Sequence, residues 1–282
     1  MMPNVGGSAT CYGVLYQILG AAHWAASIRL SASSEGQALN ECRLCIEPAE
    51  GGGDLQVSGG DARRIIEQWK AKSDHGTWSL KQTVEKVLPD LYLATPAERS
   101  DGVTEYRFVT EGRIGGWKKA EKFFASLNTL CIPDDPLAEL ADGEWLHQIG
   151  NQRLSDRQLF DYIARSLWNK GEEDLSTAYR RTWNLLGQFR LVENQTIEPL
   201  RKRVRQFLLS VVENREDVDS KLRELCGIIL ELAAKGDVTI TPHDLLKRAK
   251  LWGEPLTQWS AFYERQFTTV QRLVQREWDF IE

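Results

Sequence analysis

Long apolar runs are missing from this sequence of 282 residues. No stretch approaches the roughly 20 consecutive apolar residues that a membrane-spanning helix needs. The first residues, MMPNVGGSATCYG, have neither the charged start nor the apolar run of a secretory signal peptide. The sequence therefore disfavours a membrane or secreted protein and predicts a cytoplasmic location without a membrane partner.

A paired set of cysteines is also missing. The five cysteines are an odd number, scattered at positions 11, 42, 45, 131 and 226, which disfavours a disulfide framework and favours a reducing compartment. Cys42 and Cys45 form a C-x-x-C, but neither a second pair nor a pair of histidines completes a zinc site. Because the run CRLCI resembles a strand, we expect structural cysteines.

An excess of positive charge is the third absence. Forty acidic against 35 basic residues give a net charge of −5, which excludes nucleic-acid binding by bulk charge alone but leaves room for a local basic surface. The run PLRKRVRQF is one candidate, with two readings: a phosphate-contacting patch or a solvated helix face. Its basic residues are Arg201, Lys202, Arg203 and Arg205. The GGGD stretch lacks the lysine and helix of a phosphate loop, so nucleotide binding is not expected.

What the sequence does contain is material for a core. Hydrophobic residues make up 42% of the chain, including 10 Trp and 9 Phe. Such a chain forms one large domain or two moderate ones.

Helix and strand signals alternate in the first half. Apolar residues at helical spacing predict a helix over about 11–29, and runs ended by Pro or Gly predict strands. The second and third strands lie close enough for an antiparallel meander. A further helix has Ser79 as its N-cap and a break at Pro89. The expected order is a helix (11–29), strands (41–48, 51–61 and 63–72), a helix (79–95) and a fourth strand (104–112).

The pattern changes after about residue 130. A loop with prolines and acids at 132–144 marks a candidate boundary, and the remaining signals are almost wholly helical. The predicted helices span 155–170, 174–189, 196–214, 217–236, 241–252 and 256–280. We therefore expect an α/β fold in which an αβββαβ core (1–130) is followed by an all-helical domain (131–282). The last predicted helix runs to Glu282 without a stop signal, which indicates an N-terminal fragment of a longer protein.

The strand RRIIEQWKAK carries the candidate site. Side chains alternate along a strand, so Gln68 and Lys70 share one face while Glu67 points to the other. Asp54 heads the preceding short strand, and a meander hairpin would bring it beside Gln68. Glu47 closes the strand before that. The sequence thus predicts an acid, an amide and a lysine converging at one edge of a sheet.

Phosphodiester hydrolysis needs a set of this kind, because the phosphate is anionic and repels hydroxide. Magnesium prefers one or two carboxylates, carbonyl oxygens and waters. Asp54, the Gln68 side chain, the Trp69 backbone carbonyl and Glu47 supply such ligands for Mg²⁺, with Mn²⁺ as an alternative. Lys70 can orient the attacking water or stabilise charge on the phosphate.

The segment IEPAEGGGDLQV…RRIIEQWKAKSDHGTWSL resembles the PD-(D/E)xK nuclease superfamily in its Mrr-like, Q-x-K form. GVLYQ is similar to the first helix of that group and places Gln17 at the matching position. Glu47 and Asp54 match its acidic pair, and Gln68 and Lys70 match its Q-x-K. Gln68 is a departure from the many members that carry an acid there, and it removes one negative metal ligand.

The resemblance covers about the first 125 residues and is strongest to the double-stranded-DNA endonuclease domain of bacterial anti-phage effectors, including those associated with cyclic-oligonucleotide signalling. It implies a restriction-endonuclease-like core, Mg²⁺-dependent DNA cleavage with Asp54, Gln68, Lys70, Glu47 and Gln17 as site residues, and a fused or associated sensor or ATPase module. Because cutting both strands needs two sites, we also expect a homo-oligomer.

Plainer readings compete with each assignment. Lys70 fits a solvated strand lysine, Asp54 a turn residue after glycines, and Gln17 a buried glutamine that satisfies the backbone. Glu50 competes with Glu47, while parity assigns Glu67 to structure. His75 lies close enough to Lys70 in sequence to approach DNA, although the histidines show no metal-ligand spacing.

Two other functional classes remain open. One is a catalytically weak, nuclease-like module that binds DNA or a partner, with the helical domain mediating assembly. The other is a regulatory protein whose function lies in the helical half.

Overall fold

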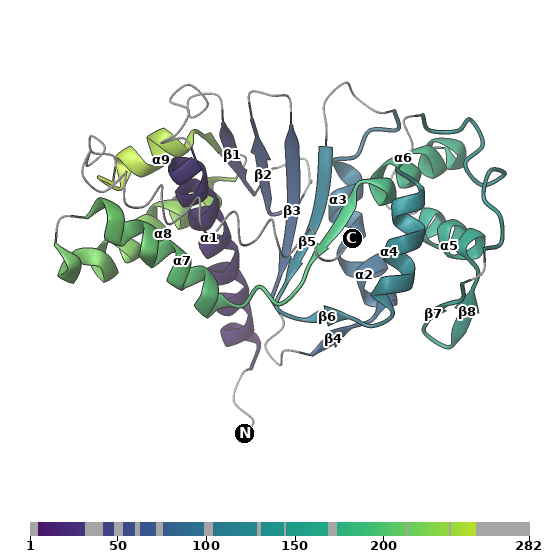
Figure 1. Cartoon of the computed structure of the whole chain (residues 1–282), viewed down its shortest axis with the longest axis horizontal. Coiled ribbons are helices and arrows are strands. Elements are labelled where there is room, and N and C mark those ends of the chain that lie inside the picture. The colour runs from purple at the N-terminus through teal and green to yellow at the C-terminus, as the bar shows by residue number, and fades with distance from the viewer. Residues whose placement is uncertain are drawn as a thin grey trace, which may run out of the picture.

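A computed structural model describes the chain over residues 5–31, 42–47, 53–59, 63–71, 76–98, 104–128, 131–143, 145–168, 174–212, 214–236 and 238–251. These residues form three layers, with a central sheet between two groups of helices (Figure 1). The helix predicted over 256–280 lies outside the described residues, as do Glu50 and His75. Across the described ranges, no helix combines the length and apolarity needed to cross a bilayer.

The central sheet has six strands in the order β10-β1-β2-β3-β5-β9. Neighbours are antiparallel from β10 to β3, and β3-β5 and β5-β9 are parallel. The antiparallel meander predicted for the second and third strands is therefore confirmed. The strands are β1 (Arg43–Ile46), β2 (Leu55–Ser58), β3 (Arg64–Lys70), β5 (Thr104–Thr110), β9 (Phe189–Val192) and β10 (Val238–Ile240).

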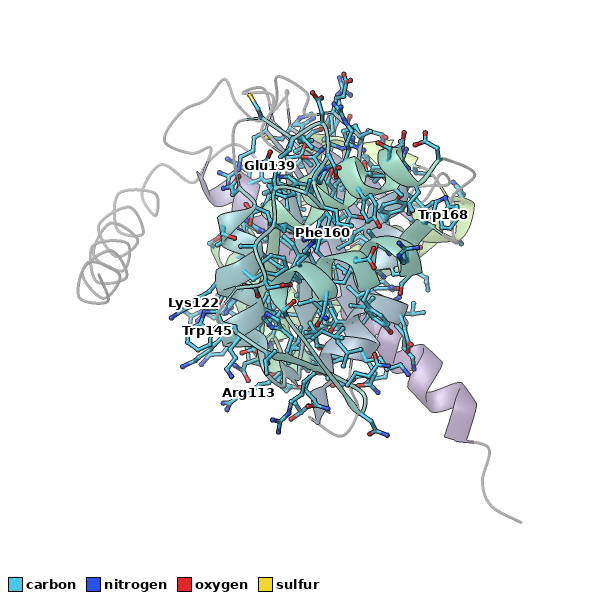
Figure 2. The ribbon with its side chains drawn as sticks, turned by 90° about the vertical axis from the view of Figure 1, so that its right-hand side faces the viewer. Arg113, Lys122, Glu139, Trp145, Phe160 and Trp168 are labelled. Carbon is cyan, nitrogen blue, oxygen red and sulfur yellow. The ribbon has the colours of Figure 1, made fainter. Side chains whose placement is uncertain are left out.

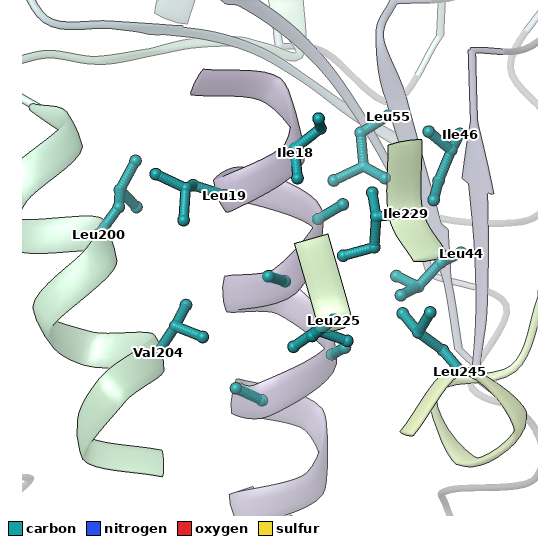
Figure 3. Close-up of a cluster of buried hydrophobic side chains, with 14 of the residues drawn as sticks. Ile18, Leu19, Leu44, Ile46, Leu55, Leu200, Val204, Leu225, Ile229 and Leu245 are labelled. Carbon is teal, nitrogen blue, oxygen red and sulfur yellow. The ribbon is translucent and has the colours of Figure 1, made fainter. Parts of the chain in front are cut away.

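One face of the sheet is covered by α1, which is itself covered by later helices. Buried aliphatic side chains of α1, such as Ile18 and Leu19, lie in one cluster with Leu225 of α8 and Leu55 of β2 (Figure 3). Because α1 meets apolar neighbours on more than one side, few polar residues interrupt it. The helices of this layer are α1 (Val5–Ser31), α7 (Ile197–Val211), α8 (Val218–Lys235) and α9 (Pro242–Arg248), with a 3₁₀ turn, η2, at Arg215–Asp217.

The other face packs against a second core rich in aromatic residues. Tyr106 and Phe108 of β5 lie there with Phe160 and Phe189. The helices of this layer are α2 (Leu80–Lys86), α3 (Leu88–Leu93), α4 (Trp117–Ser126), α5 (Asp156–Trp168) and α6 (Leu175–Gly187). Two small sheets border it: β4 (Thr77–Trp78) with β6 (Arg113–Ile114), and β7 (His147–Ile149) with β8 (Gln152–Leu154).

Local signals in the first half are largely confirmed. Ser79 caps α2 in a reciprocal capping box with Gln82. The predicted break at Pro89 separates α2 from α3, whose first turn contains that proline. The expected order of a helix, three strands, helix and strand is present, with the short β4 as an addition.

The expectation of an all-helical second half was wrong. Four strands, β7 to β10, lie beyond residue 130, and β9 and β10 extend the central sheet. The helix predicted to reach 189 ends at Gly187, because Phe189 pairs with Tyr106 instead. Such three- or four-residue strands gain stability from the neighbour they pair with, so local sequence signals them weakly. Strands on both sides of the expected boundary thus share one sheet.

Candidate functional site

The candidate site lies where β1 ends, β2 begins and β3 ends. Leu55 of β2 pairs with Glu67 of β3, which places Asp54 opposite Gln68. Two backbone hydrogen bonds continue the pairing, from the Asp54 N–H to the Glu67 carbonyl (2.8 Å) and from the Glu47 N–H to the Asp54 carbonyl (3.0 Å). Glu47, Asp54 and Gln68 therefore lie side by side across three strands.

Gly53 lets the chain approach β3 closely enough to start β2 at Asp54. Its φ is +81°, in the region that favours glycine, and a Cβ there would lie 2.5 Å from the Glu67 carbonyl oxygen. Glu47, directly after β1, also has a positive φ of 50°. A larger residue at position 53 would push Asp54 away from Gln68.

Asp54 is the centre of the site. Its Oδ2 accepts hydrogen bonds from Gln68 Nε2 (2.7 Å) and from the Trp69 backbone N–H (2.6 Å). Gln17, reaching in from α1, is a third hydrogen-bond partner. Burial raises the pKa of the Asp54 carboxyl, and the positive charge of Lys70 and these hydrogen bonds oppose the rise. Desolvation thus favours the neutral carboxyl of Asp54, whereas its hydrogen-bond donors and Lys70 favour the carboxylate.

Glu47 places a second carboxyl close to the first. Burial raises its pKa, and the negative charge of Asp54 raises it further, while Lys70 lowers it. A carboxyl whose ionisation is disfavoured by a neighbouring carboxylate is a typical environment for a bound cation, which relieves the repulsion.

Gln68 supplies a further oxygen. The side chain is buried, with 1% of its surface exposed. Because the Asp54 carboxylate only accepts, the amide nitrogen of Gln68 must face it. The Oε1 atom is left buried without a hydrogen-bond partner among the described residues. An acceptor left without a donor at a carboxylate pair is suited to binding a metal ion.

The donors fit Mg²⁺ better than a metal that needs a cage of acidic, His or Cys ligands. No three His, Cys, Asp or Glu side chains within the described ranges converge on a metal-binding point. Magnesium, however, is commonly held by one or two carboxylates with waters completing its shell. Asp54 and Glu47 supply the carboxylates, and Gln68 Oε1 adds the orphaned acceptor.

Lys70 ends β3 on the strand face that also carries Gln68. Its Nζ lies 3.5 Å from Asp90 Oδ2 in the first turn of α3, and about a third of its side chain is exposed. Its charge also acts on Asp54 and Glu47. Sequence reasoning missed Asp90, because the Leu-Pro-Asp stretch indicated only a helix break; its position beside Lys70 depends on how α3 packs against β3.

Glu67 faces the opposite way, as strand parity predicted. Its Oε2 accepts hydrogen bonds from the indole N–H groups of Trp24 (2.7 Å) and Trp69 (2.9 Å), and its Oε1 lies 3.3 Å from Arg107 Nη1. Burial raises the pKa of Glu67, and these partners oppose the rise. The network ties β3 to α1 and β5.

A cavity of about 300 Å³ opens beside the site. Gln17, Glu47 and Asp54 are its polar lining residues, and apolar residues of α1, α8 and the strands β1, β2 and β3 line the rest. Val14 and Leu230 lie at its rim, with 37% and 48% of their surfaces exposed. Glu47 and Asp54 are therefore half-buried and reachable from solvent.

The basic run on α7 is not part of this cluster. Arg201, Lys202, Arg203 and Arg205 are exposed, but acidic neighbours offset two of them. Arg205 lies 3.0 Å from Asp219 and Arg201 lies 3.9 Å from Glu198. These ion pairs indicate that the basic run is a solvated helix face and not a phosphate-contacting patch.

Comparison with known proteins gives only a weak likeness. No family model matches the sequence, and no curated protein matches it. Among solved structures, the chain is similar to the Cap4 SAVED/CARF-domain containing receptor of Acinetobacter baumannii with the cyclic trinucleotide 3'3'3'-cAAA (10% identity, TM-score 0.44, covering 88% of this chain and 46% of that one). It is also similar to the Moraxella osloensis Cap4 SAVED/CARF-domain containing receptor (10% identity, TM-score 0.44, covering 90% and 50%). The chain thus spans about half the length of these receptors, and a TM-score below 0.5 carries no functional assignment.

Proposed function

We propose that this chain is a Mg²⁺-dependent DNA endonuclease of the PD-(D/E)xK type and the effector part of a bacterial anti-phage protein. The observation that carries the nuclease proposal is the 2.7 Å hydrogen bond between Asp54 and Gln68, with Lys70 two residues further along the same strand face. An acid, an amide oxygen and a lysine at one sheet end are the groups that phosphodiester hydrolysis requires. The anti-phage part of the proposal comes from the sequence resemblance.

Asp54, Glu47 and Gln68 Oε1 would hold the metal, with the Trp69 backbone carbonyl as a further candidate ligand. When bound there, Mg²⁺ would neutralise phosphate charge and lower the pKa of a bound water. Gln17 and the Trp69 N–H fix the orientation of the Asp54 carboxylate. A carboxylate held by three donors loses little conformational freedom when a metal binds.

Lys70 supplies the positive charge that approaches the scissile phosphate. Its side chain is partly exposed, its ammonium lies 3.5 Å from Asp90 Oδ2, and its charge acts on Asp54 and Glu47. From there it can stabilise negative charge that develops on the phosphate or orient the attacking water. Asp90 pairs with this ammonium from the first turn of α3.

The test is plasmid cleavage in Mg²⁺ by the parent and by Lys70→Ala and Asp54→Ala. Each variant should lose at least about 100-fold of the cleavage rate, the ordinary scale for removing one electrostatic catalytic group. Lys86→Ala, an exposed lysine on α2, is the matched control and should cut like the parent. Lys70→Ala cutting as fast as the parent would rule out the assigned site.

A binding module that does not cut is the second candidate. It is favoured by Gln68, because a neutral amide in place of an acid lowers the negative charge available to a metal. Thermal unfolding with and without Mg²⁺ or Mn²⁺ separates the two. A nuclease should be stabilised by the metal in a manner that depends on Asp54, whereas a binder should show no such shift.

A further inference from the structure

A basic surface with an exposed aromatic ring lies on the α4 side of this acidic protein. Three lysines of α4, Lys118, Lys119 and Lys122, are exposed, and so is Arg113 of β6. Trp145 stands beside them with 40% of its surface exposed. We refer to these five residues as the basic platform; Figure 2 shows Lys122, Trp145 and Arg113 in turn along one edge of that side.

The lysines of the platform are not neutralised within the described part of the chain. No described acidic side chain forms an ion pair with Lys118, Lys119 or Lys122. Glu121 is the single acid on α4. This contrasts with α7, where Arg201 and Arg205 each lie against an acid.

Trp145 brings two of the lysines together. Lys119 Nζ lies 5.5 Å and Lys122 Nζ 5.6 Å from the centre of its ring, distances at which an ammonium is attracted to the electron-rich face. The two lysines are three residues apart and therefore neighbours on the helix surface. The ring thus concentrates two positive charges that would otherwise repel each other.

The segment that carries Trp145 is anchored by the buried side chain of His147. His147 follows Trp145 by two residues and is buried. The centre of its ring lies 6.0 Å from the centre of the Phe123 ring on α4, and its Nε2 lies 2.5 Å from Asp156 Oδ1. Phe123 belongs to the buried face of the helix whose exposed face carries the lysines. One helix therefore both anchors the loop and presents the charges.

The platform begins at the sheet end that carries the candidate site. Thr110 of β5 is the register partner of Lys70, and Arg113 follows three residues later. Three residues reach at most about 10 Å, and neighbouring strands are about 5 Å apart. The Cα of Arg113 thus lies within about 15 Å of the Cα of Lys70.

We propose that the basic platform binds the phosphate backbone of DNA and so positions it across the site. The choice of DNA as the ligand rests on the proposed function. The positive charge and the exposed aromatic ring of the surface are independent of that function. Lysines without acidic partners release counterions when they contact phosphates, and such contacts set the register of a duplex. This proposal places the contact surface on α4, in place of the α7 run that the sequence offers as one candidate.

The experiment measures binding of a short labelled duplex in EDTA, where no metal-dependent cleavage occurs. Lys119→Glu/Lys122→Glu should weaken binding at least about tenfold and make the slope of log K against log salt shallower by about two. The matched control, Arg201→Glu/Lys202→Glu on α7, should change affinity less than about threefold. Thermal unfolding confirms that both variants fold.

The outcomes separate this proposal from the nuclease proposal. Weaker binding by the α4 variant alone supports the platform, whether or not the parent cuts DNA. Equal losses in the α4 and α7 variants, or an unchanged affinity of the α4 variant, would overturn it while leaving the cleavage test of Lys70 unaffected. A parent that binds no DNA at low salt would overturn it as well.

Discussion

Lys70 at the end of β3 and Asp90 in the first turn of α3 form an ion pair, with 3.5 Å between Nζ and Oδ2. The same lysine acts electrostatically on Asp54 and Glu47. Lys70 therefore interacts with Asp90 on one side and with the Asp54 and Glu47 carboxyls on the other. An ordinary solvated lysine on a strand would have no such set of acidic neighbours.

Replacing Asp90 should test this sharing. Asp90→Asn removes a negative charge near the path of a phosphate, so we expect DNA to bind about twofold more tightly in EDTA. Because the ion pair is partly exposed, the free energy of unfolding should fall by less than about 1 kcal/mol. Glu85→Gln on α2, an exposed acid paired with Lys81, is the control for loss of one charge. A drop in affinity of several-fold would mean that Asp90 holds Lys70 where DNA needs it.

The partly desolvated carboxyl of Asp54 should weaken the metal-free fold. Asp54→Asn keeps an oxygen to accept from Gln68 and Trp69 but removes the buried charge. We expect it to raise the free energy of unfolding on the order of 1 kcal/mol at neutral pH, which raises Tm by about 2–4 °C in a domain of this size. Adding Mg²⁺ should raise the Tm of the parent and leave that of the variant unchanged. A variant less stable than the metal-free parent would contradict the assignment.

This difference should depend on pH in a defined direction. Burial raises the pKa of Asp54 in the folded state. A raised folded pKa means that the neutral carboxyl stabilises the fold fully below its ordinary pKa and that this contribution is lost as pH rises through the raised value. The stability gained by Asp54→Asn should therefore be small in acid and grow toward neutral pH. Chemical denaturation of both proteins across pH measures it; a gain that shrinks as pH rises would be inconsistent.

The Trp24–Glu67 hydrogen bond should matter for stability. Trp24→Phe removes an indole donor from a buried carboxylate, so we expect a loss of about 1–3 kcal/mol of unfolding free energy. Trp145→Phe, at an exposed tryptophan, should change it by less than about 0.5 kcal/mol. Urea denaturation at neutral pH checks both, and equal effects would show that Glu67 is satisfied without Trp24.

Core residues beyond position 130 should support the site at the other end of the sequence. Leu225 of α8 is fully buried in the cluster that contains α1 and β2. Leu225→Ala should cost about 2–5 kcal/mol and lower the Tm of a single cooperative transition. Leu209→Ala, at a side chain with 44% of its surface exposed, is the matched control. Two separate transitions, with only one affected, would instead indicate independently folding halves.

Most of the predictable geometry of the site follows from the alternation of side chains along the strand. The period of two in RRIIEQWKAK separates Gln68 from Glu67, and the glycines before Asp54 indicate a turn, so the Asp54–Gln68 contact follows from local pattern. The predicted contact is confirmed by their hydrogen bond. The catalytic roles of these residues stay predictions.

The remaining features depend on contacts between distant segments. Asp90 meets Lys70 because α3 packs on the face of β3 that carries Gln68. The strand at 238–240 forms because β1 offers it an edge. His147 positions Trp145 only once α4 and α5 are in place. None of these contacts between distant segments produces a periodic pattern or a fixed residue spacing in the sequence, so the sequence alone does not predict them.

The outer strands of the sheet, β9 and β10, are also the last of its strands to be synthesised. Until residue 240 has left the ribosome, β1 lacks its outer neighbour and exposes unpaired backbone groups, and α1 lacks the full cover of α7, α8 and α9. The carboxylates at β1 and β2 therefore gain their final setting only after residue 240 has been made. Under the proposed nuclease function, this order of synthesis would delay DNA cleavage by a chain that is still being made.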